Sequence, residues 1–154
     1  MFNFLIKQRP KPQQRHRNHG KFHYDPSSKE KKDFRLQAKE YAPKKPLTHK
    51  FDVHLTFCYK RPKSHYRSVN KEPVLKDDMP YYKTSRPDVD NLAKWVLDSL
   101  QDFYVDDAQV VSLNAIKVYG EEDYIHDFIC IFSVWLKLKK HKLHKKQTKR
   151  SLNF

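Results

Sequence analysis

This chain of 154 residues contains little glycine, cysteine or acidic charge. These shortages limit which turns, metal sites and partners the chain can have. Its two glycines allow few left-handed turns, so Pro, Asn and Asp must form most turns. Cys58 and Cys130 form no CxxC pair and lie in strand-like segments, which favours reduced, buried thiols over a cysteine zinc site. No apolar segment could span a bilayer, and the N-terminal FNFLIKQ is too short for a secretory signal. These features predict an intracellular, cytoplasmic protein that does not enter the membrane.

Basic residues outnumber acidic ones, 32 to 18, and the formal net charge is +14. A charge of this size indicates a polyanionic partner, which could be DNA, RNA or an anionic membrane surface. The length favours a single domain with a modest core that aromatic side chains help to fill. We place this domain at residues 1–138 and expect the basic tail at 139–154 to be disordered when free.

Apolar periodicity predicts four strands and two helices. The expected order is a strand at 2–6, a basic arm at 7–21, a helix after Ser27 that ends before Pro43, a strand at 51–59, a long loop at 61–86, a helix at 88–103, and strands at 109–119 and 124–138. Ser27 and Glu30 have the spacing of a capping box. The last two strands flank a turn around Gly120 and are expected to pair as a hairpin. The fold class is therefore α+β.

The segment from Arg86 to Asp107 reverses the charge of the chain, because it holds six aspartates and only two basic residues. The ordinary explanations are a solvated helix face for Asp98 and Asp102, a helix N-cap for Asp88, and a turn for Asp106 and Asp107. The alternative is metal binding, since Mg²⁺ is held by a few carboxylates while water and phosphate oxygens complete its shell. Both explanations remain open at this point.

Metal-binding acids on a basic surface suit a nuclease. Such an enzyme must neutralise a phosphodiester, stabilise the charge that builds on its oxygens and activate water, and one or two Mg²⁺ ions can do all three. Lys94 lies one helical turn after Asp90 and could stabilise the transition state. An ordinary Asp–Lys surface pair would have the same spacing.

Four features of this region occur in a particular order: DVDN at 88–91, Lys94, LDSL in the same helix, and DDAQVV at 106–111. In order and spacing they resemble the signature of the RusA family of Holliday junction resolvases. A looser likeness, through the basic N-terminus and YDPSSKEKKDF, extends over roughly residues 1–138. Pro87 stands where the family often has a basic residue, and Arg86 is one position earlier.

The resemblance implies a RusA-like small mixed sheet of about four strands with two helices, a homodimer, and Mg²⁺-dependent paired nicking of four-way junctions in DNA recombination and repair. It implies that Asp88, Asp90 and Asp107 bind the metal, that Asp106 is a neighbouring candidate, and that Lys94 is the essential lysine. Mn²⁺ is the alternative metal, and no small-molecule cofactor is expected. The host would be a bacterium, a phage or another virus.

The predicted second helix raises a geometric problem. At roughly 1.5 Å per residue, a helix over 88–103 is about 24 Å long, with Asp88 and Asp90 at one end and Asp107 beyond the other. Two such helices packed antiparallel about a two-fold axis would bring each N-terminus to the partner's C-terminus. We therefore expect shared metal sites, with Asp88 and Asp90 from one subunit and Asp107 from the other.

Basic side chains of the arm and the motif are expected to bind DNA phosphates without reading sequence. The candidates are Arg9, Lys11, Arg15, Arg17, Lys21 and Arg86. Tyr81 and Tyr82, just before the motif, could stack on an exposed base, although core packing is the expected role of at least one of them.

Two other functions fit parts of the sequence. A non-enzymatic nucleic-acid-binding protein, such as a small RNA-binding or ribosome-associated protein, explains the net charge but gives no reason for the acids and Lys94. A flap or fork nuclease on the same scaffold explains both, because branch preference depends on the shape of the assembled surface.

Overall fold

The computed structural model describes residues 2–15, 17–19, 22–120 and 127–135. Its elements, with η for a 3₁₀ turn, are β1 (Asn3–Ile6), β2 (Arg17–His19), β3 (Phe22–Tyr24), α1 (Ser28–Ala38), η1 (Lys39–Tyr41), β4 (Phe51–Tyr59), η2 (Lys63–His65), β5 (Tyr66–Val69), β6 (Glu72–Leu75), α2 (Val89–Ser99), η3 (Asp107–Gln109), β7 (Val110–Tyr119) and β8 (Phe128–Trp135). A four-stranded sheet in the order β1-β8-β4-β7 is central. The predicted α+β class, with a mixed four-stranded sheet and two helices, is confirmed.

The central strand of the sheet is β4, and its sequence explains why. Phe51, Val53, Leu55 and Phe57 are buried and alternate with partly exposed residues, as predicted. This strand pairs in parallel with β7 and antiparallel with β8, which makes the sheet mixed. The middle of the sheet removes the most apolar surface of such a strand from water.

The predicted hairpin between the last two strands is wrong. β4 lies between β7 and β8, so these two strands are not neighbours. Gly120 donates its backbone N–H to the Tyr59 carbonyl at 2.9 Å, which ties the end of β7 to the end of β4. Alternating hydrophobicity determines which face of a strand is buried, but not which strand lies beside it.

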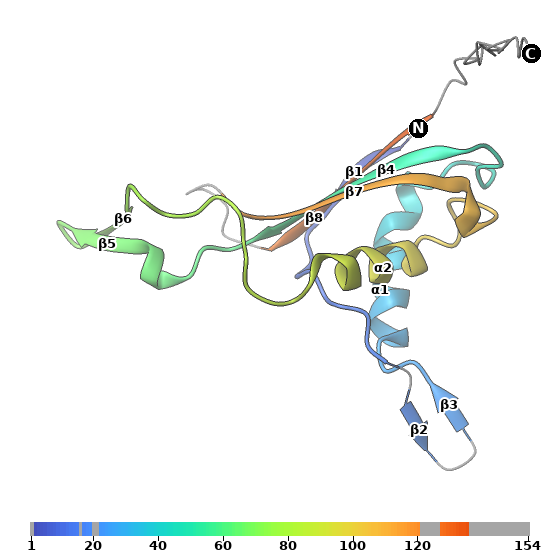
Figure 1. Ribbon diagram of the computed structural model, residues 1–154, viewed down its shortest axis with the longest axis horizontal. Helices are drawn as coiled ribbons and strands as arrows, with labels where there is room; N and C mark the ends of the chain where they lie inside the picture. Colours follow the sequence, from blue (N-terminus) through green and yellow to red (C-terminus); the bar gives the residue numbers. More distant parts are fainter. Residues whose placement is uncertain (1, 16, 20–21, 121–126, 136–154) are drawn as a thin grey trace, which may run out of the picture.

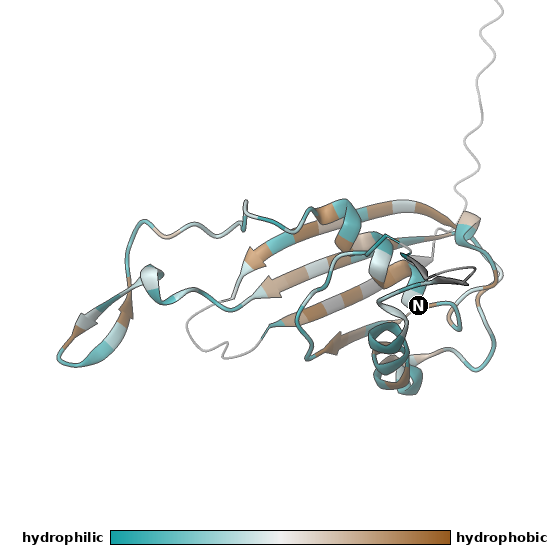
Figure 2. Cartoon of the chain, turned by 90° about the horizontal axis from the view of Figure 1, so that it is seen from below, coloured by the Kyte–Doolittle hydropathy of each residue, from teal (hydrophilic) through white to brown (hydrophobic). Residues whose placement is uncertain are grey.

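Both helices lie on one face of the sheet (Figure 1). Phe34 of α1 and Trp95 of α2 are fully buried and meet edge to face, with ring centroids 5.2 Å apart. Leu92 and Val96 of α2 belong to the same core cluster. Apolar residues alternate with polar ones along the strands of the sheet in Figure 2. The core is therefore the layer between this face of the sheet and the two helices.

The first helix begins after Ser27, as predicted, but without the predicted capping box. The Ser27 side chain makes no cap hydrogen bond. Instead, the Asp25 carboxylate accepts a hydrogen bond from the Ser27 backbone N–H at 2.8 Å. The helix and its following 3₁₀ turn end at Tyr41, before Pro43, as the sequence indicates.

The second helix is shorter than the predicted 88–103, because it ends at Ser99. Two side chains bind carbonyl groups of its last turn: the Tyr104 hydroxyl donates to Leu97 at 2.8 Å, and the Arg35 Nε donates to Ser99 at 3.3 Å. In the turn that follows, Leu100 and Phe103 stay buried, so their helical spacing reflects burial and not a helix. At roughly 1.5 Å per residue, α2 is about 16 Å long.

Two segments predicted as irregular contain hairpins. The basic arm includes β2, which pairs with β3, and the loop at 61–86 includes β5 and β6. In the second hairpin Asn70 and Lys71 adopt positive φ angles of 52° and 71°, so the turn forms without glycine. Both hairpins extend away from the sheet and helices in Figure 1.

Three remaining expectations concern the thiols, the membrane and the tail. Cys58 is free and buried, and burial raises its pKa to about 11, which keeps the thiol protonated. No helix in the described ranges combines the length and apolarity needed to cross a membrane. The structure does not describe three parts of these predictions: the Cys130 side chain, residues 136–138 of the last predicted strand, and the tail at 139–154.

Candidate active site and DNA-binding surface

Two of the predicted metal ligands, Asp88 and Asp90, lie at the N-terminal end of α2. Asp88 occupies the N-cap position with an extended backbone, as predicted, but its carboxylate makes no cap hydrogen bond. Asp90 lies in the first turn, and both residues are exposed. The positive end of the helix dipole stabilises carboxylates at this position. The Asp88 oxygens are therefore available to a ligand rather than used by the helix.

Lys94 lies on α2 one turn after Asp90 and is also exposed. The ion pairs of the described chain do not include one between these two side chains. The ordinary surface pair that their spacing allows is therefore not formed. The Asp90 carboxylate therefore remains free to contact a cation, and the Lys94 ammonium, one turn further along, remains free to contact an anion.

The second half of the motif lies on η3, and the structure assigns different surroundings to its two aspartates. Asp106 caps this turn, because its carboxylate accepts from the Ala108 backbone N–H at 2.8 Å. The Gln109 side-chain oxygen accepts in return from the Asp106 backbone N–H at 2.8 Å, which completes a capping box. Gln109 also donates to the Leu47 carbonyl at 2.9 Å. Asp106 and Gln109 thus hold the turn that presents Asp107.

Asp107 is exposed and lies beside Tyr104 in a hollow of about 350 Å³. Burial, followed by the Asp107 charge, raises the pKa of Tyr104, so its phenol stays neutral beside the carboxylate. Asp106 is thus occupied by the turn, whereas the Asp107 carboxylate is exposed beside the neutral Tyr104 phenol.

The two halves of the motif do not meet in one chain. Asp88 and Asp107 line different hollows. Within the part of the chain that the structure describes, no three His, Cys, Asp or Glu side chains are grouped closely enough to hold a metal ion. Although α2 is shorter than predicted, the separation expected from the sequence remains. In the described part of one chain, Asp88, Asp90 and Asp107 therefore do not form a three-carboxylate site.

A basic groove of about 670 Å³ lies directly beside Asp88. It is lined by Arg9, Pro10, Lys11, Pro12, Tyr59, Lys83, Arg86, Pro87, Asp88 and Asn91. The N-terminal arm reaches this groove because Gln13 donates its backbone N–H to the Asn91 carbonyl of α2 at 3.0 Å. Three of the predicted DNA contacts, Arg9, Lys11 and Arg86, therefore lie next to Asp88, the first of the predicted metal ligands.

The other predicted DNA contacts are placed differently. Arg15 and Arg17 are exposed but do not line the groove, and Lys21 lies outside the described residues. Two of the groove cations have acidic neighbours: Lys11 pairs with Glu30, and Arg9 lies 3.6 Å from the Asp127 carboxylate. These pairs orient the cations, and their exposure keeps the interaction weak enough for phosphate to compete.

Sequence reasoning missed two lysines that hold the segment leading into Asp88. The Lys83 ammonium donates to the Ser85 and Arg86 carbonyls at 3.0 and 2.6 Å. The Lys117 ammonium donates to the Ser85 and Pro87 carbonyls at 2.9 and 2.7 Å. Burial, Lys117 and Arg9 lower the pKa of Lys83. Through these bonds the two ammonium groups fix the backbone immediately before Asp88.

One sequence signal could have identified Lys117. It follows Leu113 and Ala115 at every second position of the predicted strand 109–119, where alternation favours another apolar residue, and the structure places it in register with the buried Phe57. A lysine at a core-facing strand position must find acceptors, and here it finds the Ser85 and Pro87 carbonyls. Lys83 offers no comparable signal.

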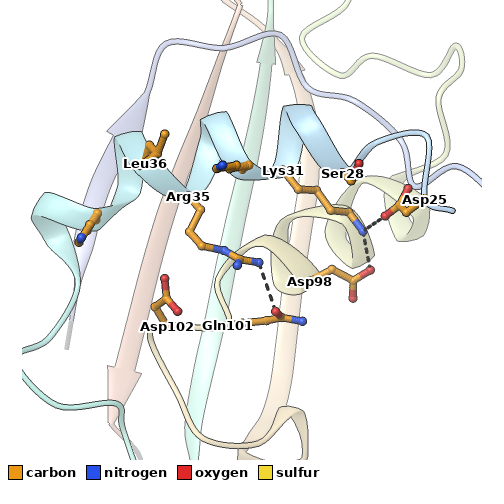
Figure 3. A pocket seen from close by; sticks show the side chains of 10 residues that line it. Asp25, Ser28, Lys31, Arg35, Leu36, Asp98, Gln101 and Asp102 are labelled. Carbon is orange, nitrogen blue, oxygen red and sulfur yellow. Dashed lines mark hydrogen bonds and ion pairs between the residues drawn. The ribbon is translucent and has the colours of Figure 1, made fainter.

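A larger hollow of about 710 Å³ lies between α1 and the end of α2, away from this site (Figure 3). Lys31 is buried there, and its ammonium lies 2.9 Å from the Asp25 carboxylate and 3.0 Å from the Asp98 carboxylate. The predicted solvated role of Asp98 is wrong, because this residue neutralises a buried lysine. Asp102 is exposed, as predicted. The acidic segment therefore combines structural and unexplained carboxylates, and Asp88, Asp90 and Asp107 are among the unexplained ones.

Comparison with known proteins identifies the family. The family model described as endodeoxyribonuclease RusA matches residues 6–126, which include both halves of the acidic motif and most of the chain. The chain belongs to the RusA endodeoxyribonuclease family. The uncharacterized protein YqaN of Bacillus subtilis (strain 168) is 34% identical over 88 residues. That match covers 56% of this RusA-family chain and 61% of YqaN, so the chain spans less than two thirds of this relative.

Within this RusA-family chain, Lys117→Met is predicted to slow DNA cleavage about tenfold, because misplacing a reacting group by about 1 Å is enough for such a loss. Methionine keeps the volume and removes the bonds to Ser85 and Pro87. Lys60→Met is the matched control, since Lys60 is exposed and loses the same charge. Single-turnover cleavage and DNA affinity should be measured for both. Equal cleavage rates in the two variants would mean that Lys117 does not position Asp88.

Proposed function

We propose that this chain is a Mg²⁺-dependent endodeoxyribonuclease that resolves four-way DNA junctions by paired, symmetric nicks. The observation that carries the proposal is the exposure of Asp88 and Asp90 at the start of α2 beside a basic groove, with Lys94 exposed one turn further along and Asp107 exposed at the far end of β7. Membership of a family named for endodeoxyribonuclease activity supports the reaction class. Branched DNA is the substrate that the family resemblance implies.

Asp88, Asp90 and Asp107 fit a magnesium ion by their chemistry, because they offer hard carboxylate oxygens and Asp88 makes no competing cap bond. When bound, the ion supplies an activated water and neutralises charge on the phosphodiester oxygens. Lys94, which forms no ion pair with Asp90, contacts a non-bridging phosphate oxygen and stabilises the negative charge that develops there. Lys83 and Lys117 keep Asp88 in place.

A second copy of the chain is needed to complete each site, and β7 offers the edge for it. β7 is an edge strand, and the 81–83 segment covers the outer side of only its last residues, around Val118. Between 110 and 116 no other described strand pairs with the outer side of β7. The exposed apolar side chains of this stretch lie on both faces of the sheet: Val111 and Leu113, 46% and 45% exposed, lie on the helix side, and Ile116, 37% exposed, lies on the opposite side. A long strand edge with unpaired backbone groups and apolar neighbours favours pairing with another chain.

The two ends of β7 carry the two halves of the motif. Its first residue, Val110, directly follows η3 and Asp107, whereas Lys117 near its other end holds the Pro87 carbonyl next to Asp88. At roughly 3.3 Å per residue, these two ends are about 23 Å apart. Antiparallel pairing of β7 with its copy, about a two-fold axis near Leu113, brings Asp107 of one subunit toward Asp88 and Asp90 of the other.

A two-fold dimer of this kind suits a four-way junction, whose arms are related by pseudo-two-fold symmetry. Two identical shared sites can then cut two opposed strands and leave nicked duplexes. Arg9, Lys11 and Arg86 in the groove supply sequence-independent affinity for phosphates, which falls steeply as salt rises.

The test compares cleavage of four-way, three-way and linear DNA that share the same arm sequences. We expect Mg²⁺ to support cleavage of the four-way junction at symmetric positions on opposed strands. Excess chelator should stop the reaction, and added Mn²⁺ should restore it. Products are resolved on denaturing gels with each strand labelled in turn, so that paired nicks can be assigned.

Two results of this assay would indicate a different function. Preferential cutting of three-way or flapped DNA would make the chain a flap or fork nuclease. Tight binding of all three substrates, with no cleavage in either metal, would make it a non-enzymatic nucleic-acid-binding protein. Full activity in excess chelator would exclude the metal.

A further inference from the structure

Tyr81 and Tyr82 form an exposed aromatic pair on the segment that leads to the site. Their side chains are 54% and 60% exposed, so the core packing expected for at least one of them is absent. The two rings meet edge to face, with centroids 5.0 Å apart and planes at 76°. Large apolar rings that contact each other and otherwise face solvent are available to a flat aromatic partner.

The backbone beneath these rings is fixed. The Tyr81 carbonyl accepts from the Tyr119 backbone N–H at 2.9 Å, Lys83 donates its backbone N–H to Lys117 at 3.0 Å, and Tyr82 forms a bridge with Val118. The rings therefore stand on what is effectively a short extra strand beside β7. Little conformational entropy is lost when such rings bind a partner, because only two side-chain torsions per tyrosine remain to be ordered.

The pair also lies beside cationic side chains on the segment that leads to Asp88. Lys83 follows it directly, and the Lys83 ammonium holds the Ser85–Arg86 carbonyls that precede the first acid. Arg61 is buried nearby, where its guanidinium donates to the Pro80 carbonyl at 3.0 Å. Exposed aromatic rings next to fixed cations are the elements from which single-stranded nucleic acid sites are built.

We propose that Tyr81 and Tyr82 bind the exposed face of a nucleobase at the branch point, and that this contact gives the chain its preference for branched DNA. The inference rests on the proposed function. In a continuous duplex each base is covered on both faces by its neighbours, whereas stacking is interrupted where strands cross. Phosphate contacts cannot make this distinction, because both substrates offer them.

The experiment measures binding of Tyr81→Ala, Tyr82→Ala and the corresponding Phe variants to a four-way junction and to a duplex of equal length. Divalent cations are left out so that nothing is cut. Base–aromatic stacking is worth about 1–3 kcal/mol per base, so each Ala variant should lose between about fivefold and about a hundredfold in junction affinity. Duplex affinity and the salt dependence should not change, and the Phe variants should bind like the parent chain.

A fluorescent adenine analogue at the crossover adds a direct signal. Its emission should be quenched on binding by the parent chain and by the Phe variants, and less so by the Ala variants. Equal losses for junction and duplex, or Phe variants as weak as the Ala variants, would overturn the inference. So would loss of the dimer by light scattering in the Ala variants, because the rings would then belong to a protein interface.

Failure of this inference can be told apart from failure of the proposed function. The parent chain is assayed for four-way junction cleavage in Mg²⁺ alongside the binding measurements. If it cuts while the Ala variants bind the junction normally, only the role of Tyr81 and Tyr82 is wrong. If it cuts no substrate, the nuclease proposal fails, whatever the binding result.

Discussion

Asp90→Asn is expected to reduce junction cleavage by about a thousandfold, the scale on which removal of a group that stabilises transition-state charge acts. The change keeps the shape of an exposed side chain in the first turn of α2 and removes the charge of one proposed metal ligand. DNA binding should persist or strengthen, because a negative charge is removed from a surface that faces phosphate. Single-turnover cleavage in Mg²⁺ and binding by fluorescence anisotropy measure the two effects separately.

The matched control for this variant is Asp98→Asn, which makes the same chemical change on the same helix. Asp98 pairs with the buried Lys31, whose other partner is Asp25. Because Asp98 is partly exposed and Asp25 remains, the change should cost about 1 kcal/mol of stability. Cleavage should stay near normal at temperatures where the variant is folded. A folded Asp98→Asn protein as inactive as Asp90→Asn would contradict the division of these acids into structural and metal-binding groups.

Two inactive variants, Asp88→Asn and Asp107→Asn, are expected to recover nicking when their subunits are mixed. If Asp88 and Asp107 of different subunits form each site, a heterodimer combines both substitutions in one site and leaves the other intact. Random exchange makes about half of the dimers heterodimers, so about a quarter of the wild-type sites should return. The product should be a singly nicked junction, because only one site per heterodimer is active.

The control for subunit mixing uses Asp88→Asn with Asp90→Asn. These residues belong to the same half-site at the start of α2, so every site of their heterodimer contains a substitution. No activity should return from this pair. Recovery from both mixtures, or from neither after subunit exchange has been verified, would mean that the sites are not shared between subunits in the proposed way.

Much of the core could be predicted from the sequence, because the core follows from hydrophobic periodicity. The alternation from Phe51 to Tyr59 identified the central strand, and helical spacing after Asp88 identified α2 and its buried face. The acids were predicted to bind a metal because they reverse the charge of a basic chain within one short segment, and their role stays a prediction. These predictions depended only on patterns along the chain.

Three features could not be predicted, because they depend on strand pairing, on an unusual turn sequence or on side-chain contacts at a helix end. The insertion of β4 between β7 and β8 is a pairing choice that alternation does not encode. The β5–β6 turn uses Asn70 and Lys71 rather than a glycine, so its usual signal is missing. The end of α2 is set by bonds from Tyr104 and Arg35, which arrive from other segments.

The different interactions of the aspartates also could not be predicted from the sequence. Asp106 and Asp107 are adjacent, and only the bonds of Asp106 to the η3 turn distinguish them. Asp98 has the spacing of a solvated residue, yet it neutralises Lys31 across the helix pair. Their roles follow from the side chains opposite them, which only the folded arrangement specifies.

Shared metal sites are tested most directly by locating bound Mn²⁺ in crystals of the protein by anomalous diffraction. A shared site should give a peak within coordination distance of Asp88 and Asp90 of one subunit and of the second subunit's copy of Asp107, with an identical peak across the two-fold axis. A peak bound by residues of one subunit alone, or no peak near Asp88 and Asp90, would contradict this arrangement.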